Sequence, residues 1–95
     1  MNSYELTIIL RNKELDAVKG KAREILQKFG VKIIKEDPWG VRRLAYQING
    51  EKEGYYDFMI VEAAPESITK IINDFRLNSD ILRYLFVNIK QEKSA

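Results

Sequence analysis

The sequence of 95 residues predicts an α+β domain whose elements follow the order β-α-β-β-α-β. Two segments place apolar residues three and four positions apart, which is typical of amphipathic helices. Segments rich in β-branched and aromatic residues flank them and indicate strands, with glycine, proline and asparagine at the junctions. Two helices that each bury one apolar stripe favour a four-stranded antiparallel sheet with both helices on one face, the ferredoxin-like class.

The first half of the chain predicts a strand, a helix and a second strand. Residues 4–10 are apolar and β-branched with partial alternation, which indicates a strand inside the sheet. A helix is expected from Lys13, with Gly30 as its C-terminal stop. Its apolar stripe consists of Leu15, Val18, Ala22, Ile25, Leu26 and Phe29. Residues 31–35 are again strand-like.

The middle of the chain leaves two arrangements open. Pro38 and Gly40 interrupt the strand pattern and apolar alternation then resumes, so we expect either one bent strand or two. Asn49-Gly50 and Gly54 bracket a polar segment that fits a hairpin turn, because Asn and Gly tolerate positive φ.

The second half predicts a strand, a helix and a closing strand. The strand that returns from the turn is expected over Tyr55 to Ala63. Pro65 suits the first position of a helix and Glu66 suits its positive end. The apolar stripe of this helix consists of Ile68, Ile71, Ile72 and Phe75. Ile81 to Ile89 is apolar at nearly every position, which indicates a strand with cover on both faces.

The residue types present exclude most catalytic chemistry. The chain has no cysteine and no histidine, so we expect neither an enzyme nor a metal or other cofactor. The net charge of +2 permits contact with nucleic acid without arguing for it. The first residues fit neither a signal peptide nor a membrane span, which predicts a cytoplasmic protein. We expect one domain over residues 1–90 and a flexible polar tail over residues 91–95.

One segment resembles the signature of a known family. Residues 39–48 read Trp-Gly-Val-Arg-Arg-Leu-Ala-Tyr-Gln-Ile, similar to the Gly-x-Arg-x-Leu-Ala-Tyr run that opens the long second strand in the bacterial ribosomal protein S6 family. Three further segments agree with the family, and the resemblance extends from residue 1 to about residue 90. These segments are Tyr4-Glu5, Gly54-Tyr55-Tyr56, and Phe75-Arg76-Leu77-Asn78 followed by Ile81-Leu82-Arg83-Tyr84-Leu85.

The resemblance implies a structural constituent of the small ribosomal subunit that acts in translation. It implies binding to small-subunit (16S) ribosomal RNA together with the eighteenth small-subunit protein as a heterodimer partner. The fold alone hosts many functions, so a small-molecule-sensing or regulatory module stays as an alternative. An acyl-phosphate hydrolase of this topology would need a phosphate-binding loop after the first strand, where only Arg11-Asn12-Lys13 occurs.

Arginines next to each other in the signature segment are the first candidates for RNA binding. Arg42 and Arg43 are adjacent in a strand, so their side chains point to opposite sides. Either can reach an RNA phosphate, and the alternative is surface ion pairing with Glu36, Glu51 or another carboxylate. Weaker candidates near chain ends or late in strands are Asn2, Tyr4, Arg83, Lys90 and Lys93.

Alternation along residues 55–63 predicts a surface for a protein partner. We expect Met59, Val61 and Ala63 in the core, and Asp57 near the exposed start of the strand. The other face is then apolar and is joined by either Tyr84 and Phe86 or Leu85 and Val87. The predicted partner surface consists of Trp39, Tyr46, Tyr56, Phe58, Ile60 and Phe86. The alternative is that these bulky side chains only cover one another.

Overall fold

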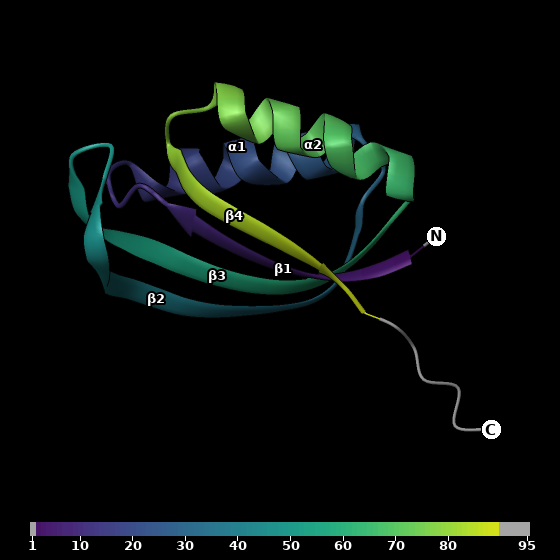
Figure 1. The fold of residues 1–95 in the computed structure, drawn as a ribbon, viewed down its shortest axis with the longest axis horizontal. Helices are drawn as coiled ribbons and strands as arrows, with labels where there is room; N and C mark the ends of the chain where they lie inside the picture. The colour runs from purple at the N-terminus through teal and green to yellow at the C-terminus, as the bar shows by residue number, and fades with distance from the viewer. Residues whose placement is uncertain (1, 90–95) are drawn as a thin grey trace.

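The structure, a computed structural model, describes residues 2–89 and confirms the predicted ferredoxin-like class. The elements are β1 (Asn2–Leu10), α1 (Leu15–Lys28), β2 (Lys32–Ile48), β3 (Glu51–Ala63), α2 (Pro65–Leu77) and β4 (Ile81–Asn88). The sheet has the order β2-β3-β1-β4, and each neighbouring pair is antiparallel. Both helices lie over one face of the sheet, and no helix covers the other face within the described residues (Figure 1).

The core lies between the helices and the central strands β1 and β3. Alternate side chains of β1 are buried, and Leu6 and Ile8 are fully enclosed because they point toward the helices. Met59, Val61 and Ala63 of β3 are buried on the same face, which confirms the prediction for this strand. The helices complete the core with Val18, Ala22 and Leu26 from α1 and with Ile71 and Phe75 from α2.

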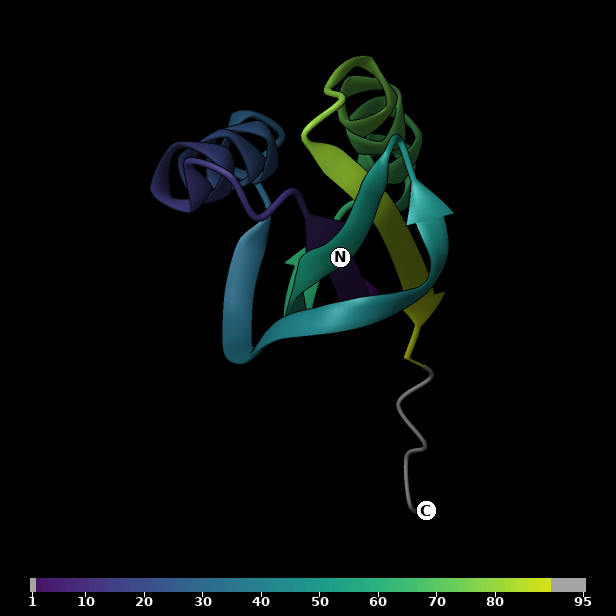
Figure 2. The same cartoon turned by 90° about the vertical axis from the view of Figure 1, so that its left-hand side faces the viewer.

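Strand β2 is one long, bent strand, which decides between the two arrangements that the sequence allows. Its pairing with β3 is irregular between Pro38 and Gly40, where Trp39 is an extra residue opposite no partner. Gly40 has a φ of 83°, a conformation that a residue with a side chain adopts only at a steric cost. After the bend, the end of β2 crosses to the side of the sheet where β4 lies and then turns up toward the helices (Figure 2).

The hairpin between β2 and β3 is tighter than the sequence suggests. Asn49 and Gly50 form the predicted turn with φ values of 50° and 80°, and Ile48 pairs directly with Glu51 across it. Strand β3 therefore begins at Glu51 and not at Tyr55. Gly54 lies inside this strand, so its expected place at the end of the turn segment is wrong.

A β-bulge in β4 sets which side chains of that strand face the helices. Leu10 of β1 pairs with Ile81 while Ile9 pairs with Arg83, so Leu82 is an extra residue in β4. Ile81 and Tyr84 therefore both pack on the helix side although they are three residues apart. Leu82 instead joins Ile9 and Leu44 in a second, smaller apolar cluster.

The close approach of strands at Gly54 gives a stability test. A Cβ atom at this position would lie 2.5 Å from Cγ2 of Ile9 and 3.3 Å from the carbonyl oxygen of Leu10. We expect Gly54→Ala to lower the free energy of unfolding by about 1–3 kcal/mol, measured by urea denaturation. Gly20→Ala is the matched control, because Gly20 lies within α1 with no atom near its Cβ position, and it should stabilise by about 0.5–1 kcal/mol. Equal effects of the two substitutions would contradict the packing at Gly54.

Candidate nucleic-acid and protein interface

Aromatic side chains gather on the sheet face that the helices leave uncovered. Tyr56 and Phe58 of β3 lie opposite Ile9 and Thr7 of β1, and both rings are half-buried. The Trp39 ring stacks on them, with its centroid 5.8 Å from that of Phe58 and 6.5 Å from that of Tyr56. Trp39 itself remains 47% exposed. The rings thus cover one another in part, as the alternative expected, and the indole still offers apolar surface to a partner.

Strand β4 contributes Leu85 and Val87 to this open face, which settles the choice that alternation left open. Their side chains are 60% and 45% exposed. The placement of Phe86 on the open face is wrong, because the bulge turns Phe86 toward the helices. Its ring packs in the core, 6.3 Å from the ring of Phe75 and 6.2 Å from that of Tyr4.

The two adjacent arginines of β2 are exposed and point to opposite sides. Within residues 2–89 neither forms an ion pair. The carboxylates of Glu36 and Glu51 pair instead with Arg23 and Arg11. The alternative of ion pairing with Glu36 or Glu51 is therefore wrong for Arg42 and Arg43. Arg42 donates from Nε to the carbonyl oxygen of Trp39 at 3.3 Å, which leaves its terminal nitrogens for other partners. Both guanidinium groups are placed where an anion from solvent can reach them.

The weaker RNA-binding candidates differ in exposure and position in the structure. Arg83 is exposed on the open face of β4, where it donates a hydrogen bond to the Tyr46 hydroxyl and lies over the Tyr46 ring. Asn2 is half-buried at the start of β1. Tyr4 is only 7% exposed because it shares the helix-facing side of β1, so its expected availability to RNA is wrong. The remaining two, Lys90 and Lys93, lie outside the described residues.

A buried carboxyl pair on the helix side was not expected from the sequence. Asp57 is 3% exposed and lies opposite Ile8, so its expected place near an exposed strand start is wrong. Burial raises the pKa of Asp57 to about 7, and the neighbouring Glu36 carboxyl contributes to this rise through its hydrogen bond and its charge. The hydrogen bond from Asp57 lowers the pKa of Glu36, which also pairs with Arg23 of α1. The proton of the pair therefore lies on Asp57, which donates it in the hydrogen bond to the Glu36 carboxylate.

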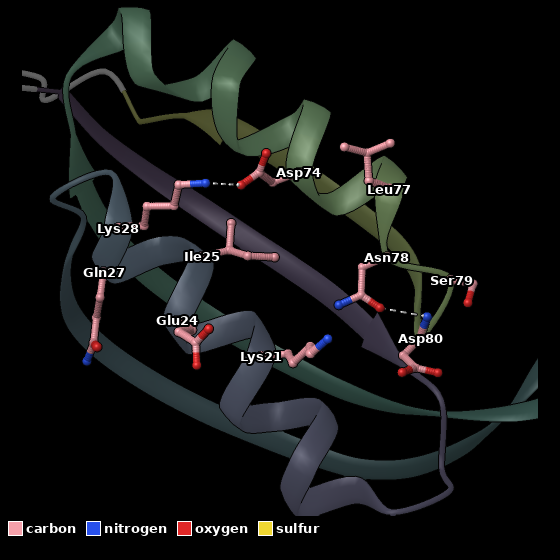
Figure 3. A pocket seen from close by; sticks show the side chains of 10 residues that line it. All are labelled: Lys21, Glu24, Ile25, Gln27, Lys28, Asp74, Leu77, Asn78, Ser79 and Asp80. Atoms are coloured by element: carbon pink, nitrogen blue, oxygen red, sulfur yellow. Dashed lines mark hydrogen bonds and ion pairs between the residues drawn. The ribbon is translucent and has the colours of Figure 1, made fainter.

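A broad groove of about 970 Å³ lies on the opposite side of the molecule, between the helices. Figure 3 shows Lys28 of α1 and Asp74 of α2 reaching across it, with Nζ and Oδ2 3.2 Å apart. At its other end the Asn78 side chain accepts a hydrogen bond from the Asp80 backbone at 3.0 Å. None of the candidate residues lines this groove, so the groove and the open sheet face are separate surfaces.

Metal ligands do not cluster in the part of the chain that the structure describes. No three carboxylates there lie close enough together to hold a metal ion. No helix among these residues has the length and apolar character needed to cross a membrane.

Fold and open face together define an α+β domain of the ferredoxin-like class, with a partly exposed apolar sheet surface near arginines that form no ion pair within residues 2–89. A family model described as ribosomal protein S6 matches residues 3–88. The chain belongs to this family, which confirms the resemblance drawn from the signature segment.

Individual relatives and a solved structure match nearly the whole chain. The small ribosomal subunit protein bS6 of Dehalococcoides mccartyi is 35% identical over 97% of this chain and 88% of its own length. The protein of the same name from Leptospira biflexa is 31% identical, covering 92% and 96%. The crystal structure of 30S ribosomal protein S6 from Thermotoga maritima superposes with a TM-score of 0.80 at 22% identity, covering 93% and 87%, and so shares the fold.

Family membership determines the coarse function. The relatives are proteins of the small ribosomal subunit, so the chain is a structural ribosomal protein and not an enzyme. Its place is the ribosome, in the cytoplasm, as expected.

The Asp57 carboxyl predicts an unusual dependence of stability on pH. Its pKa is about 7 in the folded protein against an ordinary value of 3.8, so the folded state holds more protons between these values and loses stability as pH rises toward 7. Asp57→Asn removes this titration. We expect the difference in free energy of unfolding, variant minus parent, to be larger at pH 8 than at pH 4 by about 1 kcal/mol or more. Urea denaturation at both pH values measures the difference. Glu53→Gln, an exposed change on the same strand, should show no such gain, and a gain equal to that of Asp57→Asn would contradict the assignment.

Proposed function

We propose that this ribosomal protein binds small-subunit (16S) ribosomal RNA as a heterodimer with the eighteenth small-subunit protein. The observation that supports the proposal most strongly is the open sheet face, where exposed apolar side chains lie beside Arg42 and Arg83, neither of which forms an ion pair within residues 2–89. Apolar surface favours a protein partner, and free guanidinium groups favour phosphate. RNA and protein contacts thus fall on neighbouring parts of one surface.

The modest charge of the chain supports joint binding with a partner. A net charge of +2 gives little overall attraction to RNA, and each phosphate contact adds only a local, salt-sensitive contribution. A second protein bound on the apolar face brings further basic groups to the same RNA. The complex then holds RNA more tightly than either protein alone.

Separate groups of residues serve the two contacts in this proposal. Trp39, Tyr56, Phe58 and Ile60 meet the partner protein, together with Leu85 and Val87 from β4. Arg42 and Arg43 meet RNA phosphates from opposite sides of β2, with Arg83 on the open face and Asn2 at the start of β1. Lys90 and Lys93 stay sequence predictions for RNA contact. The family assignment favours this function over the small-molecule-sensing alternative.

Salt dependence tests the RNA contacts. Affinity for a small-subunit RNA fragment is measured between 50 and 300 mM salt, a range of about sixfold, with and without the eighteenth protein. We expect tight binding only with the partner, and a logarithmic slope that becomes shallower by about 0.7–0.9 for each phosphate contact that Arg42→Ala or Arg43→Ala removes. Lys21→Ala, on the far helix side, is the control and should leave the slope unchanged. Failure to bind RNA in both conditions would refute the proposal.

A charged residue on the apolar face tests the protein contact. Leu85→Glu places a carboxylate on the exposed part of β4, where the free protein loses little stability because the side chain is already 60% exposed. We expect at least tenfold weaker binding to the eighteenth protein by isothermal titration calorimetry, because the charge would be desolvated in the interface. Leu77→Glu is the matched control, since Leu77 is 86% exposed on α2. Impaired binding in both variants, or in neither, would contradict the proposed surface.

A further inference from the structure

Two small hollows lie side by side at the end of the β2–β3 hairpin. They share Leu44, Ala45 and Tyr46, so Tyr46 stands between them. The first, of about 220 Å³, is lined further by Ile9, Ile48, Tyr56 and Arg83. The second, of about 270 Å³, is lined further by Arg43, Gln47 and Lys52.

The first hollow combines an apolar floor with aromatic and cationic walls. Leu44 packs on Ile9 in the smaller apolar cluster, and this gives the floor. Tyr46 and Tyr56 add rings, and the Arg83 guanidinium carbon lies 5.3 Å from the centroid of the Tyr46 ring. A flat heteroaromatic group with polar edges matches such a site, because it can stack on rings or guanidinium planes and accept hydrogen bonds from arginine.

The second hollow has the character of an anion site. Arg43 and Lys52 line it, and within residues 2–89 neither forms an ion pair. The Gln47 amide adds a neutral donor. A guanidinium and an ammonium group facing one hollow suit a phosphate, which accepts hydrogen bonds from both.

We propose that the two hollows together bind one unpaired nucleotide of the RNA, with its base in the first and its phosphate in the second. The inference rests on the proposed RNA-binding function and adds the kind of RNA feature that is recognised. A base within a duplex is stacked on its neighbours and is not available to such a site, whereas a base in a loop or bulge is. Tyr46, which the sequence placed on the surface for the protein partner, is thereby assigned to RNA.

The hairpin is held in place before any ligand binds. Arg11 at the end of β1 pairs with Glu51 of the hairpin at 3.5 Å and with Asp80 before β4 at 3.3 Å. Leu44 is buried against Ile9, which fixes the other side of the turn. A site on a fixed hairpin binds without the entropic cost of ordering a loose loop.

Substitutions at Tyr46 and Arg43 separate the two halves of the site. RNA affinity of the complex with the eighteenth protein is measured over a salt series for each variant. We expect Tyr46→Ala to weaken binding about tenfold because the stacking ring is removed, with the salt slope unchanged. Arg43→Ala should make the slope shallower by about 0.7–0.9. Tyr46→Phe keeps the ring and should stay within about threefold of the parent. Tyr46 is 58% exposed, so these variants keep the core intact.

The outcomes distinguish this inference from the proposed function. RNA binding that is unchanged in Tyr46→Ala would overturn the nucleotide site and leave the RNA-binding function standing. Absence of RNA binding by the parent would overturn the function, and a titration with adenosine 5′-monophosphate followed by NMR then tests the hollows directly. Amide shifts confined to the hairpin around Tyr46 would support the site. Shifts elsewhere, or none at millimolar nucleotide, would overturn it.

Discussion

The burial of one sheet face beneath two helices is the constraint on which the rest of this structure depends. Side chains of a strand alternate between faces, so each strand must keep its apolar set on the helix side along its whole length. β-Bulges meet this demand where the spacing of apolar residues departs from two. In β4 the extra residue Leu82 keeps both Ile81 and Tyr84 in the core and turns Arg83 outward. In β2 one extra residue is Trp39, which reaches over the rings of β3.

The same constraint explains the carboxyl pair beneath α1. Asp57 occupies a helix-facing position of β3, and burying its charge there is costly unless a proton or a cation compensates. A proton held by Asp57 removes the charge and is donated to Glu36 on the neighbouring strand, and Glu36 in turn pairs with Arg23 on the helix. Because these groups come from β2, β3 and α1, they join three elements at the sheet edge.

Binding surface arises on the face that this arrangement leaves uncovered. Its centre is apolar, and Arg42 and Arg83 lie near its margins. Arg11 fixes the long hairpin at the far end of the sheet through two carboxylates, so Arg43 and Tyr46 project from a defined position. In the proposed function, a fixed position of these side chains lowers the entropic cost of binding RNA.

The sequence by itself determined the order of elements, the helix stripes, the Asn49-Gly50 turn and the family signature, because these depend on residues near one another in the chain. It favoured Met59, Val61 and Ala63 as the core face of β3 without deciding it, and the structure confirms that choice. Only the tertiary structure decided that Phe86 turns inward, that Asp57 is buried, and that Arg83 meets Tyr46. The physical reason is that a bulge changes the facing of the side chains beyond it and an earlier strand start changes which positions are enclosed. Both depend on pairing between strands far apart in the sequence.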